Sequence, residues 1–362
     1  MKNFIVLSYG RQNEYQRAVF AVLSFWAWYR GDRASVQTII YTDNPAYFQP
    51  YLAGLPVHYE LLTPEQLTYM KGPARYVHRV KVRLLELIFA RFPARDILYI
   101  DTDTFFVADP AALLARLGPG TSLMHQPEYL LQDAVGVFAE FGQQHYPEQL
   151  LELLAREAFR VAGQPTRFYS RQMAWNSGVL GLSCQHADLL PDVLALTDTF
   201  FARTRWFVSE QLAFSLVLQN QTQLLGCQAY LLHYWGRQQK GLMDAQLALL
   251  LRAGFQQAPL PERLRQVRQL TGPWQRRVEA DRLREGALYA FANRQPTAGL
   301  KYTLKSLIKA PFSRYFLHRL LVMGRRTLAP VPTAKPAHHP GRSEPARFTP
   351  KAWGQVTRSR SE

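Results

Sequence analysis

The chain has 362 residues, of which 48% are hydrophobic and 13% aromatic, so it can bury a full globular core. Its formal net charge is +16, but residues 301–362 hold 13 Lys or Arg against 2 acidic residues, and the first 300 residues carry only +5. The basic charge belongs mainly to the C-terminal end, and it does not indicate a nucleic-acid-binding core.

The sequence shows no sign of secretion or of a membrane span. Cys184 and Cys227 are too few for a disulfide framework or a zinc knuckle and favour a reducing compartment. The start MKNFIVLSYG has no cleavage site after its apolar run, so we expect a strand there. Residues 18–29 are apolar but too short to cross a bilayer. We therefore expect a cytoplasmic protein.

Short apolar runs alternate with helix-period stretches in the first half of the chain. We expect strands at 3–8, 36–41, 57–62 and 97–100, and helices at 14–29 and about 75–91. This alternation predicts an α/β fold with a mostly parallel central sheet covered on both faces. In such sheets ligands bind at the carboxyl ends of the strands.

The later segments are less regular. We expect strands at 121–126 and 178–182, a strand running into a turn at 223–236, and helices at 147–161, 210–219 and within 240–295. The predicted organisation is one main domain at 1–240, a helical C-terminal extension at 241–326 and a disordered basic tail at 327–362.

The segment ILYIDTDTFFVADP, residues 97–110, places two aspartates at the end of a buried strand. Side chains two residues apart on an extended chain point the same way, so Asp101 and Asp103 both face the crevice at the sheet edge. Charges beside a buried strand are costly without a partner, although such a pair also caps turns. Carboxylate oxygens suit Mg²⁺ or Mn²⁺, particularly when a diphosphate completes the shell.

The order of three motifs resembles a known family. The Asp-x-Asp strand end, WNSGVLGL some 70 residues later and then HYWG are similar to the GT-A fold glycosyltransferases, especially glycosyltransferase family 8. The resemblance covers roughly residues 1–240. It implies a Rossmann-like GT-A catalytic domain that takes a nucleotide-diphosphate sugar as donor and uses Mn²⁺ or Mg²⁺ as cofactor.

The resemblance also implies a metal site and phosphate contacts. Asp103 would bind the metal directly, Asp101 would contact the metal or the ribose, and His233 would be the third ligand. Gly236 would let the backbone approach the phosphates. Where the family often has a phosphate-binding lysine, this chain has Gln239, so Lys240 or else Arg237 is the candidate.

Other residues follow from the same resemblance. Asn176 would lie near the donor sugar and the acceptor, with Gly178 allowing close packing behind it, although an NSG triplet is also a common turn. Glu210 and Gln211 are the candidates for the acceptor side of the donor sugar, although such a pair is also ordinary in the first turn of a helix.

The remaining candidates would contact the nucleotide. Ser8 and Tyr9 match positions that hold the base and ribose. Asp43 could accept a hydrogen bond from the N3–H of uracil, or it could simply form an Asx turn. The helix before the acidic pair carries Arg75, Arg79, Lys81 and Arg83, which would ordinarily form a solvated face; the resemblance makes Lys81 the first candidate for the diphosphate or sugar and Arg79 the second.

These expectations define a hexosyltransferase that moves a sugar, with UDP as the expected nucleotide, to a saccharide or lipid-linked acceptor in cell-surface glycan synthesis. They leave open the sugar, the acceptor and whether the configuration is retained or inverted. Two alternatives are a haloacid-dehalogenase-type phosphatase and a non-enzymatic nucleic-acid-binding protein. Against the phosphatase, Phe105 stands where Thr or Val is usual, and the pair follows the fourth strand rather than the first.

Residues 299–326 combine two apolar stripes with rows of Lys and Arg on either side of Pro311. The second stripe includes Phe312, Tyr315 and Met323. Either these segments pack on the core, or they form an interfacial hairpin that holds the protein against an anionic inner membrane leaflet. The second interpretation predicts peripheral membrane association and suits a glycolipid acceptor.

Overall fold

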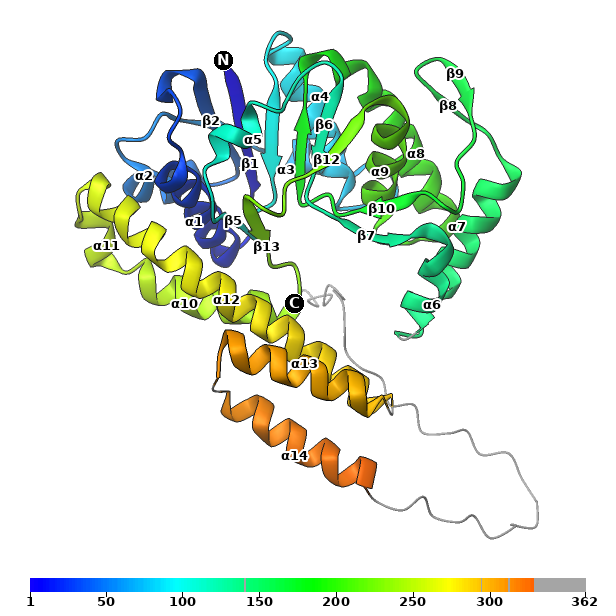
Figure 1. Ribbon diagram of the computed structural model, residues 1–362. Coiled ribbons are helices and arrows are strands. Elements are labelled where there is room, and N and C mark those ends of the chain that lie inside the picture. Colours follow the sequence, from blue (N-terminus) through cyan, green and yellow to red (C-terminus); the bar gives the residue numbers. More distant parts are fainter. Residues whose placement is uncertain (140, 294, 312, 329–362) are drawn as a thin grey trace, which may run out of the picture. The chain divides into compact units, whose positions relative to one another are not determined.

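The computed structural model describes residues 1–139, 141–293, 295–311 and 313–328 (Figure 1). Within these residues a central sheet has seven strands in the order β12-β6-β11-β4-β1-β2-β3. They are β1 (Lys2–Ser8), β2 (Val36–Thr42), β3 (Val57–Leu61), β4 (Ile97–Ile100), β6 (Thr121–Met124), β11 (Val179–Leu182) and β12 (Gln223–Gly226). All neighbours pair in parallel except β11, which is antiparallel to β4 and β6. The predicted mostly parallel α/β sheet is confirmed.

Alternate residues of the central strands point to opposite faces of the sheet, and each face buries its own helices. On one face Phe4 stacks on Phe25 of α1 (Gln12–Trp28), with ring centroids 4.2 Å apart. Phe106 of β5 (Thr104–Phe106) lies edge-on to Phe25 at 5.2 Å. This aromatic packing holds α1 next to the segment that follows β4.

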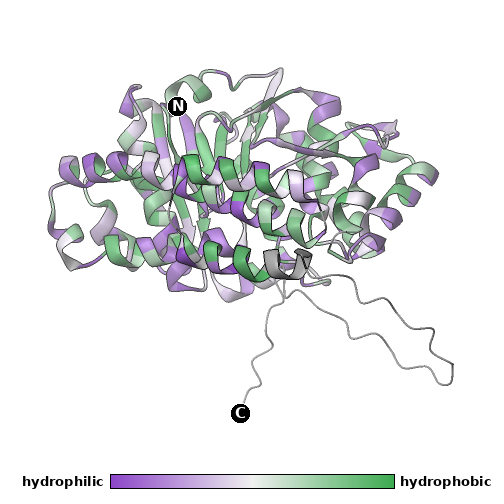
Figure 2. Cartoon of the chain, turned by 60° about the horizontal axis from the view of Figure 1, so that its bottom comes forward, coloured by the Kyte–Doolittle hydropathy of each residue, from purple (hydrophilic) through white to green (hydrophobic). Residues whose placement is uncertain are grey.

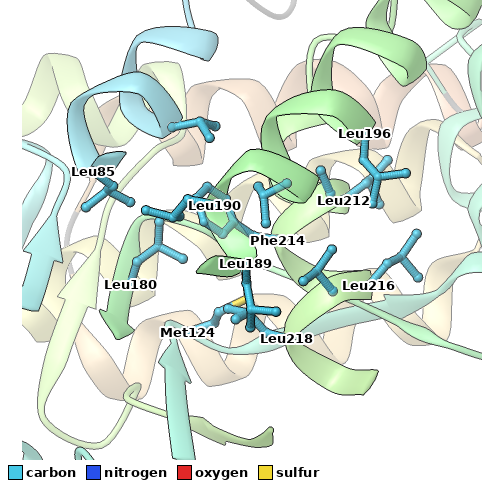
Figure 3. Packing of buried hydrophobic residues seen from close by; sticks show 14 of the residues in the cluster. Leu85, Met124, Leu180, Leu189, Leu190, Leu196, Leu212, Phe214, Leu216 and Leu218 are labelled. Atoms are coloured by element: carbon cyan, nitrogen blue, oxygen red, sulfur yellow. The ribbon is translucent and has the colours of Figure 1, made fainter. Parts of the chain in front are cut away.

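The opposite face is covered by α4 (Arg79–Arg91), α8 (Leu190–Thr204) and α9 (Ser209–Gln221). Figure 3 shows Leu85 of α4 and Leu180 of β11 in the same cluster as the leucines of α8 and α9. Residues 209–218 of α9 are all buried, including Glu210 and Gln211. A helix surrounded on all sides holds its polar side chains in fixed positions, which matters for the site below.

The remaining elements of the first 235 residues connect or flank the sheet. The helices are α2 (Pro45–Leu52), α3 (Pro64–Lys71), α5 (Pro110–Leu114), α6 (Ala134–Ala139) and α7 (His145–Arg156), and the 3-10 helices are η1 (Arg33–Ser35), η2 (Leu131–Asp133) and η3 (Cys184–Leu189). The strands are β7 (Pro127–Leu130), β8 (Phe159–Val161), β9 (Gln164–Thr166), β10 (Met173–Trp175) and β13 (Leu231–His233), and β7 pairs with β10, β5 with β13, and β8 with β9. Figure 2 shows helices whose hydropathy alternates along their length, as amphipathic helices require.

Two predicted elements differ from the structure. The helix expected from about residue 75 begins at Arg79, because Arg75 adopts a left-handed conformation with φ of 52° that a helix does not continue. The strand running into a turn expected at 223–236 is instead two strands, β12 and β13, with the turn between them closed by a hydrogen bond from the N–H of Tyr230 to the carbonyl of Cys227. The helix α8 and the short helices α2, α3, α5 and α6 were not predicted.

The chain divides into two compact units. The first contains Met1–Trp235 and Met243–Thr271, and the second contains Gly236–Leu242 and the residues from Gly272 onward. The later helices are α10 (Arg237–Leu250), α11 (Ala253–Gln257), α12 (Leu260–Ala292), α13 (Pro296–Lys309) and α14 (Arg314–Leu328). The predicted boundaries at 240 and 326 stay predictions, and the predicted disordered tail from 329 to the end lies outside the described residues.

In the second unit α12 contacts both following helices. Arg284 donates to the carbonyl of Ala310 and lies 5.7 Å from the ring of Phe316, and Lys309 pairs with Glu279. Among the described residues, no helix is long and apolar enough to cross a membrane.

Candidate metal and donor site

The two aspartates lie in the turn that joins β4 to β5. The backbone N–H of Asp101 donates to the carbonyl of Gly178 (2.8 Å), and the N–H of Tyr234 donates to the carbonyl of Asp103 (2.9 Å). The hydroxyl of Thr104 donates to the carbonyl of Asp101 (2.8 Å). The turn is therefore held by β11 on one side and by the end of β13 on the other, and Asp103 is only 5% exposed.

His233, the last residue of β13, completes a cluster with the two aspartates. One ligand atom from each of Asp101, Asp103 and His233 lies within 4.8 Å of the others. The pairing of β13 with β5 places His233 opposite Thr104, next to the turn. Two carboxylates and an imidazole form a donor set that suits a hard or borderline divalent cation. The structure therefore brings together the three ligands predicted from the sequence.

The hydrogen bonds of Asn176 determine which nitrogen of His233 faces the aspartates. Oδ1 of Asn176 accepts from the N–H of Gly178 (3.0 Å) and lies 2.7 Å from Nδ1 of His233, so Nδ1 carries the proton in neutral imidazole. Nε2 then presents its lone pair to Oδ1 of Asp103 at 3.2 Å. Two acceptors at this distance repel each other unless a proton or a cation lies between them, so the geometry fits a metal site.

Gly178 leaves room for the histidine ring. A Cβ built on Gly178 would lie 2.3 Å from both Cε1 and Nδ1 of His233. No side chain fits at that distance, so His233 can occupy its position only because residue 178 is glycine. The predicted role of Gly178 in close packing agrees with this geometry.

A second network lies on the other side of Asn176. Glu128 of β7 accepts from Nδ2 of Asn176 (3.0 Å) and from Nε2 of Gln211 (2.9 Å), and Oε1 of Gln211 accepts from the N–H of Ser177 (3.3 Å). Asn176 and Gln211 were predicted site residues, whereas Glu128 and Ser177 were not. Glu128 stands in no recognisable motif, and only the pairing of β7 with β10 brings it close.

Lys81 lies between two carboxylates. Its ammonium group is 3.2 Å from Oδ2 of Asp101 and 3.4 Å from Oε1 of Glu210, and it donates to the carbonyl of Ser177 at 2.9 Å. Burial lowers the pKa of Lys81, but the charges of Asp101 and Glu210 outweigh burial and raise the pKa above its ordinary value. Lys81 is therefore a permanent positive charge beside the cluster of Asp101, Asp103 and His233.

Glu210 is 2% exposed and accepts a hydrogen bond from the hydroxyl of Ser177 (3.1 Å). Burial raises the pKa of Glu210 to about 7, although the ammonium of Lys81 opposes this and the carboxylate of Asp101 adds to it. The side chain can consequently change its protonation state near neutral pH.

Asp43, Ser8 and Tyr9 lie where β1 and β2 end at the same edge of the sheet. Asp43 accepts from the N–H of Gly10 (2.9 Å) and from the hydroxyl of Tyr15 (2.7 Å), so it holds the turn between β1 and α1. Ser8 is buried, and its hydroxyl has no hydrogen-bond partner among the described residues. Burial, Glu14 and Asp43 raise the pKa of Tyr9. Their predicted contacts with a nucleotide stay predictions.

The guanidinium of Arg79 donates to Asp198 (2.7 Å) and to the carbonyl of Met70 (2.9 Å), and its predicted contact with the diphosphate or sugar stays a prediction. Gly236 and Lys240 belong to the second unit, where the N–H of Lys240 donates to the carbonyl of Gly236 (2.8 Å) in the first turn of α10. A Cβ on Gly236 would lie 2.0 Å from Oε1 of Gln239, so glycine leaves space for that side chain. The phosphate contacts predicted for Gly236 and Lys240 stay predictions.

No protein-family model and no curated protein matches the chain. Among solved structures it resembles the bifunctional glycosyltransferase WbbM, at 10% identity and a TM-score of 0.41 over 62% of this chain and 38% of WbbM. It also resembles the galactosyltransferase LgtC in complex with donor and acceptor sugar analogues and an active-site mutant of LgtC, both at 11% identity over 61% of this chain and 72% of LgtC, with TM-scores of 0.39 and 0.38. All three are glycosyltransferases, the class that the sequence motifs resemble. The chain spans less than half of WbbM and every TM-score lies below 0.5, so the proposal below rests on the geometry of the site.

Proposed function

We propose that the protein is a metal-dependent glycosyltransferase that moves a sugar from a nucleotide-diphosphate sugar, with UDP as the nucleotide. The observation that carries the proposal is the cluster of Asp101, Asp103 and His233 at the carboxyl ends of the strands. The proposed acceptor is a saccharide or a lipid-linked saccharide of a cell-surface glycan. Mn²⁺ is the cation that we would test first, and Mg²⁺ the second.

A divalent cation at this cluster would stabilise the negative charge that leaves with the nucleoside diphosphate when the bond to the sugar breaks. Lys81 contributes a second positive charge, which its burial makes more effective than a charge in water. Asn176 orients the ring of His233 by accepting a hydrogen bond from Nδ1 of the histidine. Such a site stabilises charge as it develops at the leaving group and needs no proton transfer there.

The acceptor side of the site is assigned to Glu210 and Gln211. Both are buried on α9, and Gln211 reaches Glu128 while Glu210 pairs with Lys81. A group that acts mainly in the transition state changes kcat more than donor affinity. Replacing Glu210 by Gln should therefore lower kcat with little change in donor KM, whereas a higher donor KM at unchanged kcat would reassign Glu210 to donor binding.

Calorimetry tests the metal role directly. UDP should bind in the presence of Mn²⁺ and not in EDTA, and Asp103→Ala should abolish the metal-dependent binding. Asp188→Ala is the control, because Asp188 is exposed and lies outside the cluster. Equal affinity for UDP in EDTA and in Mn²⁺ would remove the metal role. If binding does require Mn²⁺, a panel of nucleotide sugars assayed for Mn²⁺-dependent hydrolysis would identify the donor.

We also propose that α13 binds an anionic membrane surface peripherally. Leu300, Leu304 and Ile308 lie at four-residue spacing and are 55%, 53% and 84% exposed, whereas the buried residues of the helix are the small Gly299 and Ser306. These three large apolar side chains thus face solvent, whereas Leu307 is half-buried, and the three support the interpretation of an interfacial helix rather than a packed one.

The charge of the same region is complementary to an anionic surface. Lys301 and Lys305 flank the stripe and are exposed, and residues 286–328 contain no Asp or Glu. Each basic residue close to an anionic bilayer contributes about 1 kcal/mol of attraction. The side chains of Phe312, Tyr315 and Met323, which the sequence placed on a second stripe, lie outside those that the structure describes.

Cosedimentation with vesicles that contain anionic lipid tests this surface. The full chain should sediment with the vesicles, and a variant with Gln at 300, 304 and 308 should remain in solution. Leu249→Gln is the control, since Leu249 is 54% exposed on α10. Equal cosedimentation of the triple variant, or of a chain truncated after Ala298, would remove the role of this helix.

A further inference from the structure

The residue between the two aspartates is tied to a different part of the molecule. Thr102 is 8% exposed, and its hydroxyl donates to Oε2 of Glu14 on α1 at 2.6 Å. Glu14 comes from the first helix, 88 positions earlier in the chain. The central residue of the Asp-x-Asp turn is therefore anchored to α1, while the aspartates on either side of it belong to the metal cluster.

Glu14 is itself held by a buried arginine. Its Oε1 accepts from Arg17 at 2.6 Å, and Arg17 is 4% exposed. Two further nitrogens of Arg17 donate to the two carboxylate oxygens of Asp244 on α10, each at 2.6 Å. We call Thr102, Glu14, Arg17 and Asp244 the support chain. All four residues belong to the first unit.

The geometry of the support chain makes it stiff. A guanidinium bound to a carboxylate through two parallel hydrogen bonds has a fixed orientation, and the guanidinium of Arg17 is itself buried. α1 itself is packed on the sheet through Phe25 and its aromatic neighbours. Glu14 is therefore a fixed acceptor, and it holds the side chain of Thr102 toward α1.

Holding Thr102 affects both of its neighbours. In the turn between β4 and β5 the side chain of Thr102 reaches Glu14 on α1, whereas the side chains of Asp101 and Asp103 reach the cluster. Two carboxylates placed so close together repel each other, so a fixed backbone between them helps to hold both toward the cluster. The support chain counteracts this repulsion without contacting the cation.

From these contacts we propose that Thr102, Glu14, Arg17 and Asp244 are positioning residues that preset the two aspartates for metal binding. The proposal rests on the metal-dependent function proposed above and extends it to residues that are not ligands. Hydrogen-bond partners behind the ligands of a metal typically change its affinity by about 10-fold to 100-fold when they are removed.

The test compares variants of the full chain for Mn²⁺ affinity, measured by electron paramagnetic resonance in the presence of UDP, and for thermal unfolding in EDTA. Thr102→Val keeps the shape of the side chain and removes its hydroxyl, and should weaken Mn²⁺ binding about 10-fold or more. Thr102→Ser restores the hydroxyl and should restore the affinity. Thr197→Val is the control, because Thr197 is fully buried on α8 and its hydroxyl has no partner among the described residues.

The outcomes separate this proposal from the proposed function. If the unaltered protein binds no Mn²⁺, both fail. If it binds Mn²⁺ and Thr102→Val binds equally well, or loses only thermal stability, the support chain has no positioning role and the metal function stands. Should Thr102→Val not fold, Glu14→Gln takes its place with the same expectation, since an amide cannot satisfy Thr102 and Arg17 as the carboxylate does.

Discussion

Replacing Gly178 by alanine would test whether the position of His233 determines metal binding. The added Cβ would lie 2.3 Å from the Cε1 and Nδ1 atoms of the ring. Ordinary van der Waals contact begins at 3.4 Å, so the ring must retreat by about 1 Å. That movement also separates Nδ1 from the Oδ1 atom of Asn176, which now lies at 2.7 Å.

The magnitude follows from the length of a metal–nitrogen bond. An imidazole nitrogen binds a cation at about 2.0–2.1 Å, so a displacement of about 1 Å breaks the bond. We expect Gly178→Ala to weaken Mn²⁺ binding at least about 10-fold, which corresponds to about 1.4 kcal/mol. Overpacking should also lower the free energy of unfolding by about 1–3 kcal/mol.

A glycine on the same strand provides the control. A Cβ on Gly181 would lie 2.6 Å from Cδ1 of Leu123, in the apolar core and away from the ligands. Gly181→Ala should therefore reduce the free energy of unfolding in EDTA and leave the Mn²⁺ affinity of the folded protein unchanged. The Mn²⁺ affinities of the two variants are compared by calorimetry in the presence of UDP, at a temperature where both variants are folded. If Gly178→Ala bound Mn²⁺ as tightly as Gly181→Ala does, His233 would not be a ligand.

Three further expectations concern the same site. Burial raises the pKa of Glu210 to about 7 in the folded protein, whereas the unfolded chain releases this proton above pH 4.5. The stability that the protonated Glu210 contributes is therefore fully present below pH 4.5 and is lost as the pH rises through 7. Chemical denaturation in EDTA should therefore show that the free energy of unfolding falls by up to about 3 kcal/mol between pH 5 and 7.5, and that Glu210→Gln lacks this fall. Parallel pH curves for the two proteins would contradict the raised pKa. Asn176→Leu, which leaves Nδ1 of His233 without its acceptor, should weaken Mn²⁺ binding about 10-fold by calorimetry, and unchanged binding would show that the tautomer does not matter. Mn²⁺ at 100 times its Kd should stabilise the protein by about 2.7 kcal/mol in thermal unfolding. His233→Ala should remain folded and lose this stabilisation. If the variant does not fold, His233 is a core residue and not a ligand.

Local patterns in the sequence determined the outline of the sheet and the main ligands. The runs that became β1, β2, β3 and β4 are short, apolar and separated by helix-period stretches, so their parallel arrangement follows from alternation alone. The acidic pair was predictable because both aspartates directly follow one of these strands. His233 was predictable only because of the resemblance to a family, since nothing local marks a histidine in an apolar segment as a ligand.

The partners of these residues were decided by the tertiary structure. Glu14 and Thr102 are 88 positions apart, Arg17 and Asp244 are 227 apart, and Asn176 and Glu128 meet through a pairing of two short strands. The periodicity of a sequence reports which side of an element is buried, but it carries no information about which distant element covers that side. The aspartates could therefore be found from the sequence by itself, whereas the groups that orient them, and the glycine contact that admits His233, depend on how the helices and strands pack.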